Sequence, residues 1–147
     1  MQNDAVEVFV KVPVQHTDGY ALFIGNDEKT IIIYVDGSTG DAIRMIRSGT
    51  KKERPLTHDL MNLMMQGFGI DVKRVYINDV IDGTFFARLS LEMKNELGTK
   101  IVEIDARPSD SITMALMAGI PIYMSRKILD SEEDMTEIME KIIRQDD

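Results

Sequence analysis

The chain has 147 residues, of which 44% are hydrophobic and 29% charged, and its net charge is −8. This length and composition are typical of one globular domain and exclude a chain that is disordered throughout. Cysteine is absent, which excludes disulfides, thiol catalysis and thiolate metal sites. The negative charge disfavours binding to nucleic acid through charge alone, because such binding needs Lys and Arg to neutralise phosphates.

The N-terminal third of the chain is predicted to form three strands and a short helix. Alternating valines predict a strand over residues 6–14, and a turn leads from it into a second strand over residues 20–24. Residues 30–35 are apolar at almost every position, which predicts a strand in the centre of the sheet. A helix is predicted over residues 41–48, ended by Gly49.

The rest of the chain is predicted to repeat this order with more helix. Thr57 is the expected N-cap of a helix that runs to Gln66. The Asp82-Gly83 turn joins two predicted strands, and a loop is expected over residues 93–98. The remaining predictions are strands over residues 72–80, 84–92 and 100–105, a helix over 109–118, an edge strand over 122–124 and a last helix from Ser131.

One segment of the sequence occurs twice. Residues 35–45 read VDGSTGDAIRM and residues 104–114 read IDARPSDSITM, with aspartates and apolar residues at a constant offset. We therefore predict two similar halves, over about residues 6–50 and 72–124. The predicted fold class is α+β, with a mixed, mostly antiparallel sheet and packed helices.

A single domain is predicted over residues 1–130. Residues 131–147 are predicted to form an amphipathic C-terminal helix with an acidic tail. The segment 1–12 lacks the regions of a signal peptide, and the longest apolar runs are too short to span a bilayer. We therefore expect a cytoplasmic protein without a membrane partner.

Residues 54–129 resemble the bifunctional nuclease domain family. The resemblance rests on four ordered segments: RPLTHDL at 54–60, DGTFFA at 82–87, IDARPSDS at 104–111 and GIPIY at 119–123. It implies a cytosolic domain whose plant relatives cut both DNA and RNA, and it implies no settled catalytic residues or metal. One departure is Met117, which stands where the family pattern has a basic residue.

Two segments carry the residue types that phosphodiester hydrolysis requires. The reaction needs an activated water and neutralised phosphate charge, which carboxylates with a hard cation, arginine and histidine can supply. Both segments begin helices, where free N–H groups favour anions. The candidate catalytic residues are His58, Asp59, Asp105 and Asp110. The candidate substrate-binding residues are Arg54, Thr57, Arg107 and Ser109.

Glu103, Asp105 and Asp110 are the candidate ligands of a divalent metal, Mg²⁺ or Mn²⁺. No organic cofactor is expected. These residues favour a metal-assisted nuclease of low sequence specificity, provided that the His58 and Arg107 segments meet in space. Nucleic acid is then the substrate, although the net charge disfavours its binding.

A structural interpretation stays open for the same residues. Ser109 could cap its helix, Asp110 could favour the helix dipole, and Arg107 could pair with Asp105. The alternative function is a non-catalytic module that binds a protein partner or a small anion in the same cleft. A homodimer is also expected, with methionines such as Met61 or Met65 in a subunit contact.

Overall fold

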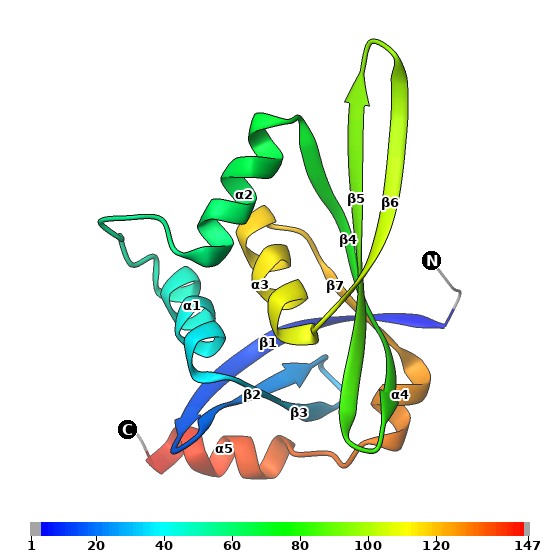
Figure 1. The fold of residues 1–147 in the computed structure, drawn as a ribbon. Helices are drawn as coiled ribbons and strands as arrows, with labels where there is room; N and C mark the ends of the chain where they lie inside the picture. Colours follow the sequence, from blue (N-terminus) through cyan, green and yellow to red (C-terminus); the bar gives the residue numbers. More distant parts are fainter. Residues whose placement is uncertain (1–3, 146–147) are drawn as a thin grey trace.

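The computed structural model describes residues 4–145, which form seven strands and five helices (Figure 1). The strands are β1 (Ala5–His16), β2 (Gly19–Gly25), β3 (Thr30–Val35), β4 (Ile70–Ile81), β5 (Thr84–Asn95), β6 (Gly98–Ala106) and β7 (Ile122–Ser125). The helices are α1 (Gly37–Ser48), α2 (Thr57–Gly67), α3 (Pro108–Ala118), α4 (Arg126–Ser131) and α5 (Thr136–Gln145).

The strands form one mixed sheet in the order β3-β2-β1-β7-β4-β5-β6. Strand β7 pairs antiparallel with β1 and parallel with β4, whereas the other neighbours are antiparallel. This confirms the α+β class. The predicted edge position of residues 122–124 is wrong, because β7 joins the two groups of three strands at the centre of the sheet.

Strand β3 lies at one edge of the sheet, so its predicted central position is wrong as well. Its apolar residues are buried for a different reason. Ile31 and Ile33 join the core, and the amide of Met135 donates to the carbonyl of Thr30 over 2.7 Å. The segment that precedes α5 therefore covers part of an edge that would otherwise be open to solvent.

Each half of the chain contains three antiparallel strands followed by a helix, and the halves flank β7. A duplication would produce this order. The residue correspondence of the repeat is not reproduced, however, because Asp36 caps α1 whereas Asp105 lies within β6. The common origin of the halves stays a prediction.

The ends of the helices differ from the predicted ones. Helix α1 begins at Gly37, because the Asp36 side chain accepts a hydrogen bond from the amide of Thr39 and starts the helix early. Leu56, not Thr57, is the N-cap of α2. At the C-terminal end, α4 was missed and α5 begins at Thr136 rather than Ser131.

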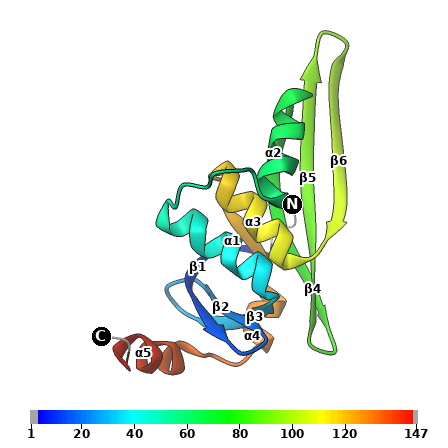
Figure 2. The ribbon, with the colours of Figure 1, turned by 60° about the vertical axis from the view of Figure 1, so that its left-hand side comes forward.

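The β5–β6 hairpin is longer than predicted. Residues 93–95 continue β5, and a tight turn at Glu96 and Leu97 replaces the expected loop. Gly98 follows the turn with φ 135°, a conformation that glycine adopts without strain. In Figure 2 this hairpin extends well beyond the other strands.

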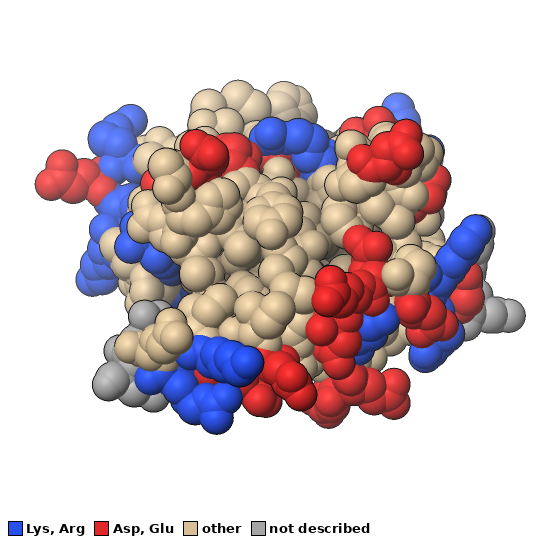
Figure 3. Space-filling view, turned by 90° about the horizontal axis from the view of Figure 1, so that it is seen from below, with Lys and Arg blue, Asp and Glu red and all other residues tan. Residues whose placement is uncertain are grey.

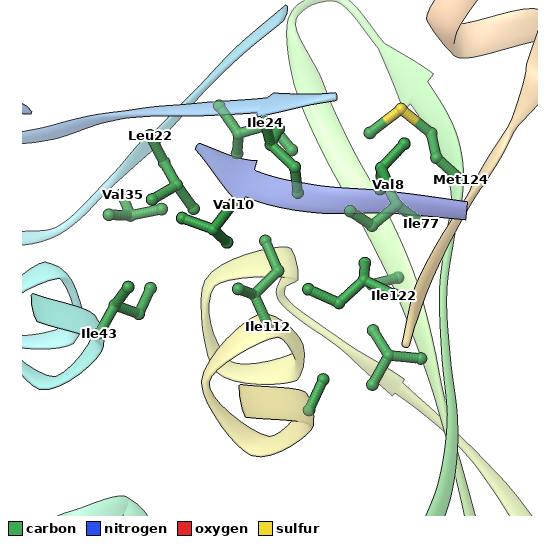
Figure 4. Close-up of a cluster of buried hydrophobic side chains, with 14 of the residues drawn as sticks. Val8, Val10, Leu22, Ile24, Val35, Ile43, Ile77, Ile112, Ile122 and Met124 are labelled. Atoms are coloured by element: carbon green, nitrogen blue, oxygen red, sulfur yellow. The ribbon is translucent and has the colours of Figure 1, made fainter. Parts of the chain in front are cut away.

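Helices α1 and α3 lie side by side on the sheet (Figures 1 and 2). Each buries an isoleucine: Ile43 of α1 and Ile112 of α3 are fully buried. Figure 4 shows them beside strand residues that include Val10, Leu22 and Ile122. This packing fixes the N-terminal ends of both helices relative to the sheet.

Candidate functional site

The two sequence segments meet at the start of α3. His58 of α2 and Asp110 of α3 are joined by a hydrogen bond of 2.8 Å between Nε2 and Oδ1. These residues are 52 positions apart in the sequence, so the contact depends on the tertiary fold. The structure therefore meets the condition on which the nuclease hypothesis depends, that the His58 and Arg107 segments come together in space.

Arg107 extends this contact toward α1. Its Nε donates to Asp110 Oδ2 over 2.9 Å, and its Nη2 donates to Oδ1 over 3.3 Å. Its Nη1 lies 3.6 Å from Oδ1 of Asp36, the N-cap of α1. The four side chains Asp36, Arg107, Asp110 and His58 therefore link three helices, and we call them the clasp.

The local sequence explains why Arg107 stands where it does. Arg107 is the N-cap of α3, and Pro108 follows at the first helical position, where its missing N–H costs nothing. Asp110 lies in the first turn, three residues from Arg107, so their side chains are neighbours. The structural interpretation of Ser109 as the cap is wrong, because Ser109 is a buried helical residue, and the predicted partner of Arg107, Asp105, is replaced by Asp110.

Both carboxylates of the clasp are held in the charged form. Burial raises the pKa of Asp110, but hydrogen bonds from Arg107 and His58 outweigh this effect and lower the pKa below its usual value. Burial also opposes the ionisation of Asp36. Hydrogen bonds from Ser38 and Thr39, together with the charge of Arg107, nevertheless lower the pKa of Asp36 to about 2.

The clasp runs from the interior to the surface. The exposed fraction of the side chain is 12% for His58, 31% for Asp110 and 63% for Arg107. Arg107 and Asp36 also line a cavity of about 310 Å³, together with Tyr34 and Phe85. His58 lines a second cavity of about 380 Å³. A ligand can therefore reach Arg107 directly, whereas the more buried His58 borders a cavity.

Thr57 lies beside His58 at the start of α2 and lines the same cavity of about 380 Å³. Thr57 is exposed, and it is the first residue of the helix rather than its cap. Its hydroxyl group is therefore near the clasp but outside its hydrogen-bond chain.

Asp59 and Arg54 lie in a different environment. Asp59 Oδ2 accepts from the amide of Leu56 over 2.8 Å, and Lys52 Nζ lies 2.7 Å from the same oxygen. The hydrogen bond from Lys52 is the main reason that the pKa of Asp59 is lowered. Arg54 and Asp59 line a separate cavity of about 290 Å³. The structure thus uses Asp59 to start α2 and groups it with Arg54 rather than with the clasp.

The proposed metal ligands do not gather around one point. Glu103 and Asp105 are exposed residues of β6, and Glu103 Oε1 lies 4.0 Å from Arg88 Nε. Both oxygens of Asp110 already accept hydrogen bonds from cationic or imidazole donors. Within residues 4–145, no three His, Asp or Glu side chains are placed to share a metal ion. Asp110 therefore does not fit the role of metal ligand.

Asp36 is the member of the clasp that the sequence did not reveal as a site residue. Its position in the repeated segment was the available signal, because it ends an apolar strand and precedes a helix. Its partner Arg107 is 71 positions away, and only the packing of α1 on α3 brings the two together.

Charge is distributed unevenly over the surface. The face seen in Figure 3 has an uncharged centre, with acidic side chains gathered on one side and Lys and Arg in separate groups at the margin. This face lacks the continuous basic surface typical of proteins that bind nucleic acid by charge.

Among the described residues, no helix is both long and apolar enough to cross a bilayer.

Comparisons with known proteins place this site in a family context. The model of the bifunctional nuclease domain matches residues 22–137. An uncharacterized protein of Mycobacterium tuberculosis is 35% identical over 104 residues, which are 71% of this chain and 59% of that protein. The chain thus spans about three fifths of the length of this relative.

Two rice proteins are also similar. Bifunctional nuclease 1 of Oryza sativa subsp. indica is 30% identical over 76 residues, which are 51% of this chain and 22% of that protein. Bifunctional nuclease 2 of Oryza sativa subsp. japonica is 32% identical over 79 residues, which are 54% of this chain and 24% of that protein. The similarity to these proteins therefore concerns a part of each of them.

Proposed function

Because the chain belongs to the bifunctional nuclease domain family, we propose that it cleaves phosphodiester bonds of DNA, RNA or both with low sequence specificity. The observation that supports this best is the hydrogen bond of 2.8 Å between His58 and Asp110. A histidine oriented by a carboxylate is a common arrangement for a general base.

The charge state of Asp110 determines which nitrogen of His58 carries the proton. A carboxylate with a lowered pKa can only accept, so His58 Nε2 is the donor to Asp110. In the neutral imidazole the other nitrogen, Nδ1, is then free to accept a proton. We therefore assign to His58 the removal of a proton from the attacking water, and to Asp110 the orientation of the ring.

Arg107 is the proposed phosphate ligand. Its guanidinium is well exposed, and its contact with Asp36 is long at 3.6 Å, so a phosphate can compete for Nη1 at little cost. The free N–H groups at the start of α3 add to the attraction for an anion. Ser109 has a place in this site only through its backbone, because its side chain is buried. Contacts to phosphate carry no sequence information, which supports low specificity.

Metal assistance is a separate part of the proposal. Mg²⁺ is often bound through one or two carboxylates together with phosphate oxygens of the substrate. Since Asp110 is occupied, Glu103 and Asp105 are the remaining candidates to hold Mg²⁺ or Mn²⁺. Both lie on the face of the sheet opposite Val102 and Ile104, so such an ion would neutralise a phosphate of a nucleic-acid strand on that face rather than the phosphate bound by Arg107. Arg54 and Thr57 are proposed to contact more distant parts of the nucleic acid, and Asp59 is proposed to act through Lys52, which it holds beside Arg54.

One observation favours the alternative of a non-catalytic module. Every charged group of the clasp has a partner within the clasp, as in an ion-pair network whose role is to join elements. In that case His58 and Asp110 would stabilise the packing of α2 on α3. A protein partner or a small anion would then be bound without being converted.

The two functions differ in the effect of single substitutions. We propose to measure cleavage of labelled single- and double-stranded DNA and RNA by highly purified protein in EDTA, Mg²⁺ or Mn²⁺. The variants are His58→Ala and Asp105→Asn. The matched controls are His16→Ala at the exposed end of β1 and Asp27→Asn in an exposed turn. A nuclease loses turnover in His58→Ala while staying folded, and metal dependence is lost in Asp105→Asn.

Full activity in folded His58→Ala, equal to that of His16→Ala, would point to a contaminating enzyme and end the catalytic proposal. Activity in EDTA equal to that in Mg²⁺ would contradict the proposed role of a metal ion.

We also propose a cytoplasmic location, on the basis of the cysteine-free composition, and a homodimer. Fractionation of cells that express the tagged chain would contradict this location if the protein were recovered outside the cytoplasm.

A further inference from the structure

Many of the exposed apolar side chains of the described residues lie on two elements, α2 and β6. Every residue of α2 keeps intermediate or high exposure, and every residue of β6 except Ala106 is exposed. The large apolar side chains involved are Leu60, Met61, Leu63, Met64 and Phe68 in or directly after α2, and Leu97, Val102 and Ile104 in or beside β6. We call these eight residues the α2–β6 surface.

The register of the hairpin assigns Val102 and Ile104 to the same side of the sheet as the core. Val102 pairs with Leu91 and Ile104 with Leu89, and Leu89 is buried in the core. Directly opposed residues of antiparallel strands share a face. Ile101 therefore points to the other face of the sheet. Helix α2 packs on β4, and Met65 of α2 joins the core, so α2 covers this same side of the sheet. Strand β5 lies between β4 and β6, so α2 and β6 flank one face of the sheet (Figures 1 and 2).

This surface carries little charge although the chain has a net charge of −8. On β6, the register places the exposed Lys100 on the same face as Val102. The charged or titratable side chains of α2 are His58 and Asp59, and they are bound to Asp110 and Lys52. The other exposed residues of α2 are uncharged. Two copies of the chain can therefore meet at this surface without the repulsion that their other faces would cause.

The exposed fractions correspond to roughly 800 Å² of apolar surface, at about 180 Å² for a fully exposed large side chain, and specific interfaces bury about 800 Å² on each partner. The free edge of β6 also presents unpaired backbone groups beside the apolar residues. We infer that the α2–β6 surface is the isologous interface of a homodimer, with a second copy of this chain as its occupant.

The inferred dimer has a consequence for His58. Helix α2 carries His58 but contributes no fully buried residue, so its position is only weakly fixed within one copy. The partner copy would cover the outer side of α2 and hold His58 against Asp110. This consequence rests on the proposed nuclease function, whereas the interface itself does not.

Sedimentation equilibrium at several protein concentrations tests the interface. Phe68→Asp and Tyr34→Asp form a matched pair, because these aromatic side chains are 76% and 70% exposed and only Phe68 belongs to the α2–β6 surface. We expect a dimer for the wild type and for Tyr34→Asp. For Phe68→Asp we expect roughly 30-fold or more weaker association, the effect of removing a central anchor residue.

A second matched pair tests the face of β6. Val102→Lys is expected to weaken the dimer, whereas Ile101→Lys on the opposite face of the strand is expected to leave it intact. Far-UV circular dichroism shows that each variant is folded. A monomeric wild type at about 100 μM, far above the Kd range of specific interfaces, would overturn the inference. Equal dimerisation of Phe68→Asp and Tyr34→Asp, or equal weakening by the two β6 variants, would overturn it too.

The test separates this inference from the nuclease proposal. A dimer that contains the α2–β6 surface but has no nuclease activity would leave the interface in place and end only the catalytic proposal. A wild-type monomer with nuclease activity would overturn the interface and leave the catalytic proposal in place. If both hold, turnover per subunit is expected to fall in the monomeric Phe68→Asp variant. It is expected to stay at the wild-type value in Phe9→Asp, because Phe9 is a half-exposed aromatic residue outside both the α2–β6 surface and the cavity of Arg107.

Discussion

The hydrogen bond between His58 and Asp110 can be measured as a coupling free energy. The cycle contains the wild type, His58→Ala, Asp110→Ala and the double variant. A hydrogen bond to a charged group contributes about 1.5–3 kcal/mol, and the partial exposure of Asp110 (31%) places the expected value at the lower end. We therefore expect a coupling of about 1–2 kcal/mol, with each single variant about 1–3 kcal/mol less stable than the wild type.

The two single variants lose stability for different reasons. His58→Ala removes a nearly buried ring and leaves Asp110 with Arg107 as its partner. Asp110→Ala leaves the imidazole without its acceptor and leaves Arg107 with the longer contact to Asp36. Because these losses share one contact, the double variant should be less destabilised than the sum of the single variants.

Urea unfolding followed by far-UV circular dichroism gives all four free energies, since the chain has no tryptophan for fluorescence. Asp27→Ala, in an exposed turn, is the control and should stay within about 0.5 kcal/mol of the wild type. A coupling below about 0.3 kcal/mol, the usual scatter of independent sites, would show that the contact does not join α2 to α3 in solution.

Three further predictions concern stability. Asp36→Ala removes the cap of α1 and should lower the free energy of unfolding by about 1–2 kcal/mol in urea titrations; no change would show that the cap is dispensable. The pKa of Asp36 is about 2 in the folded state, below the usual 3.8 of an aspartate, so its contribution to stability is complete above pH 4 and is lost as the pH falls through 2. Acid titrations of Asp36→Asn should accordingly show a smaller loss of stability over that range than the wild type, and equal losses would contradict this. Ile112→Ala creates a cavity between α3 and the sheet and should cost about 2–5 kcal/mol, with a drop in Tm that calorimetry measures; a cost below about 1 kcal/mol would mean that the core collapses around the site.

Local patterns in the sequence predicted most of the elements. The alternating valines of β1 and the Asp82-Gly83 turn of the β4–β5 hairpin depend on neighbouring residues, and the structure has both. The positions of β3 and β7 in the sheet could not be predicted in this way. They depend on which distant segment covers each edge, and the contact of Met135 with Thr30 joins parts of the chain that no local pattern relates.

Only part of the candidate site could be predicted, because some of its residues have a local pattern and others depend on distant contacts. His58 and Asp110 were identifiable because both lie at helix starts within motifs that carry titratable residues. The contact of Asp59 could not be identified from the sequence, because a carboxylate at the third position of a helix can accept a hydrogen bond from the backbone or can act on a substrate. The pairing of Asp36 with Arg107 depends on the packing of α1 against α3 and has no local signature.

The turnover of the clasp variants tests the proposed nuclease site most directly. We would measure kcat on a labelled oligonucleotide for the wild type, His58→Ala, Asp110→Asn and the double variant, each confirmed as folded. If His58 and Asp110 act as one catalytic unit, each single variant loses about 100-fold or more and the double variant is hardly worse than either. Wild-type kcat in the folded variants would contradict the proposed catalytic role of the clasp.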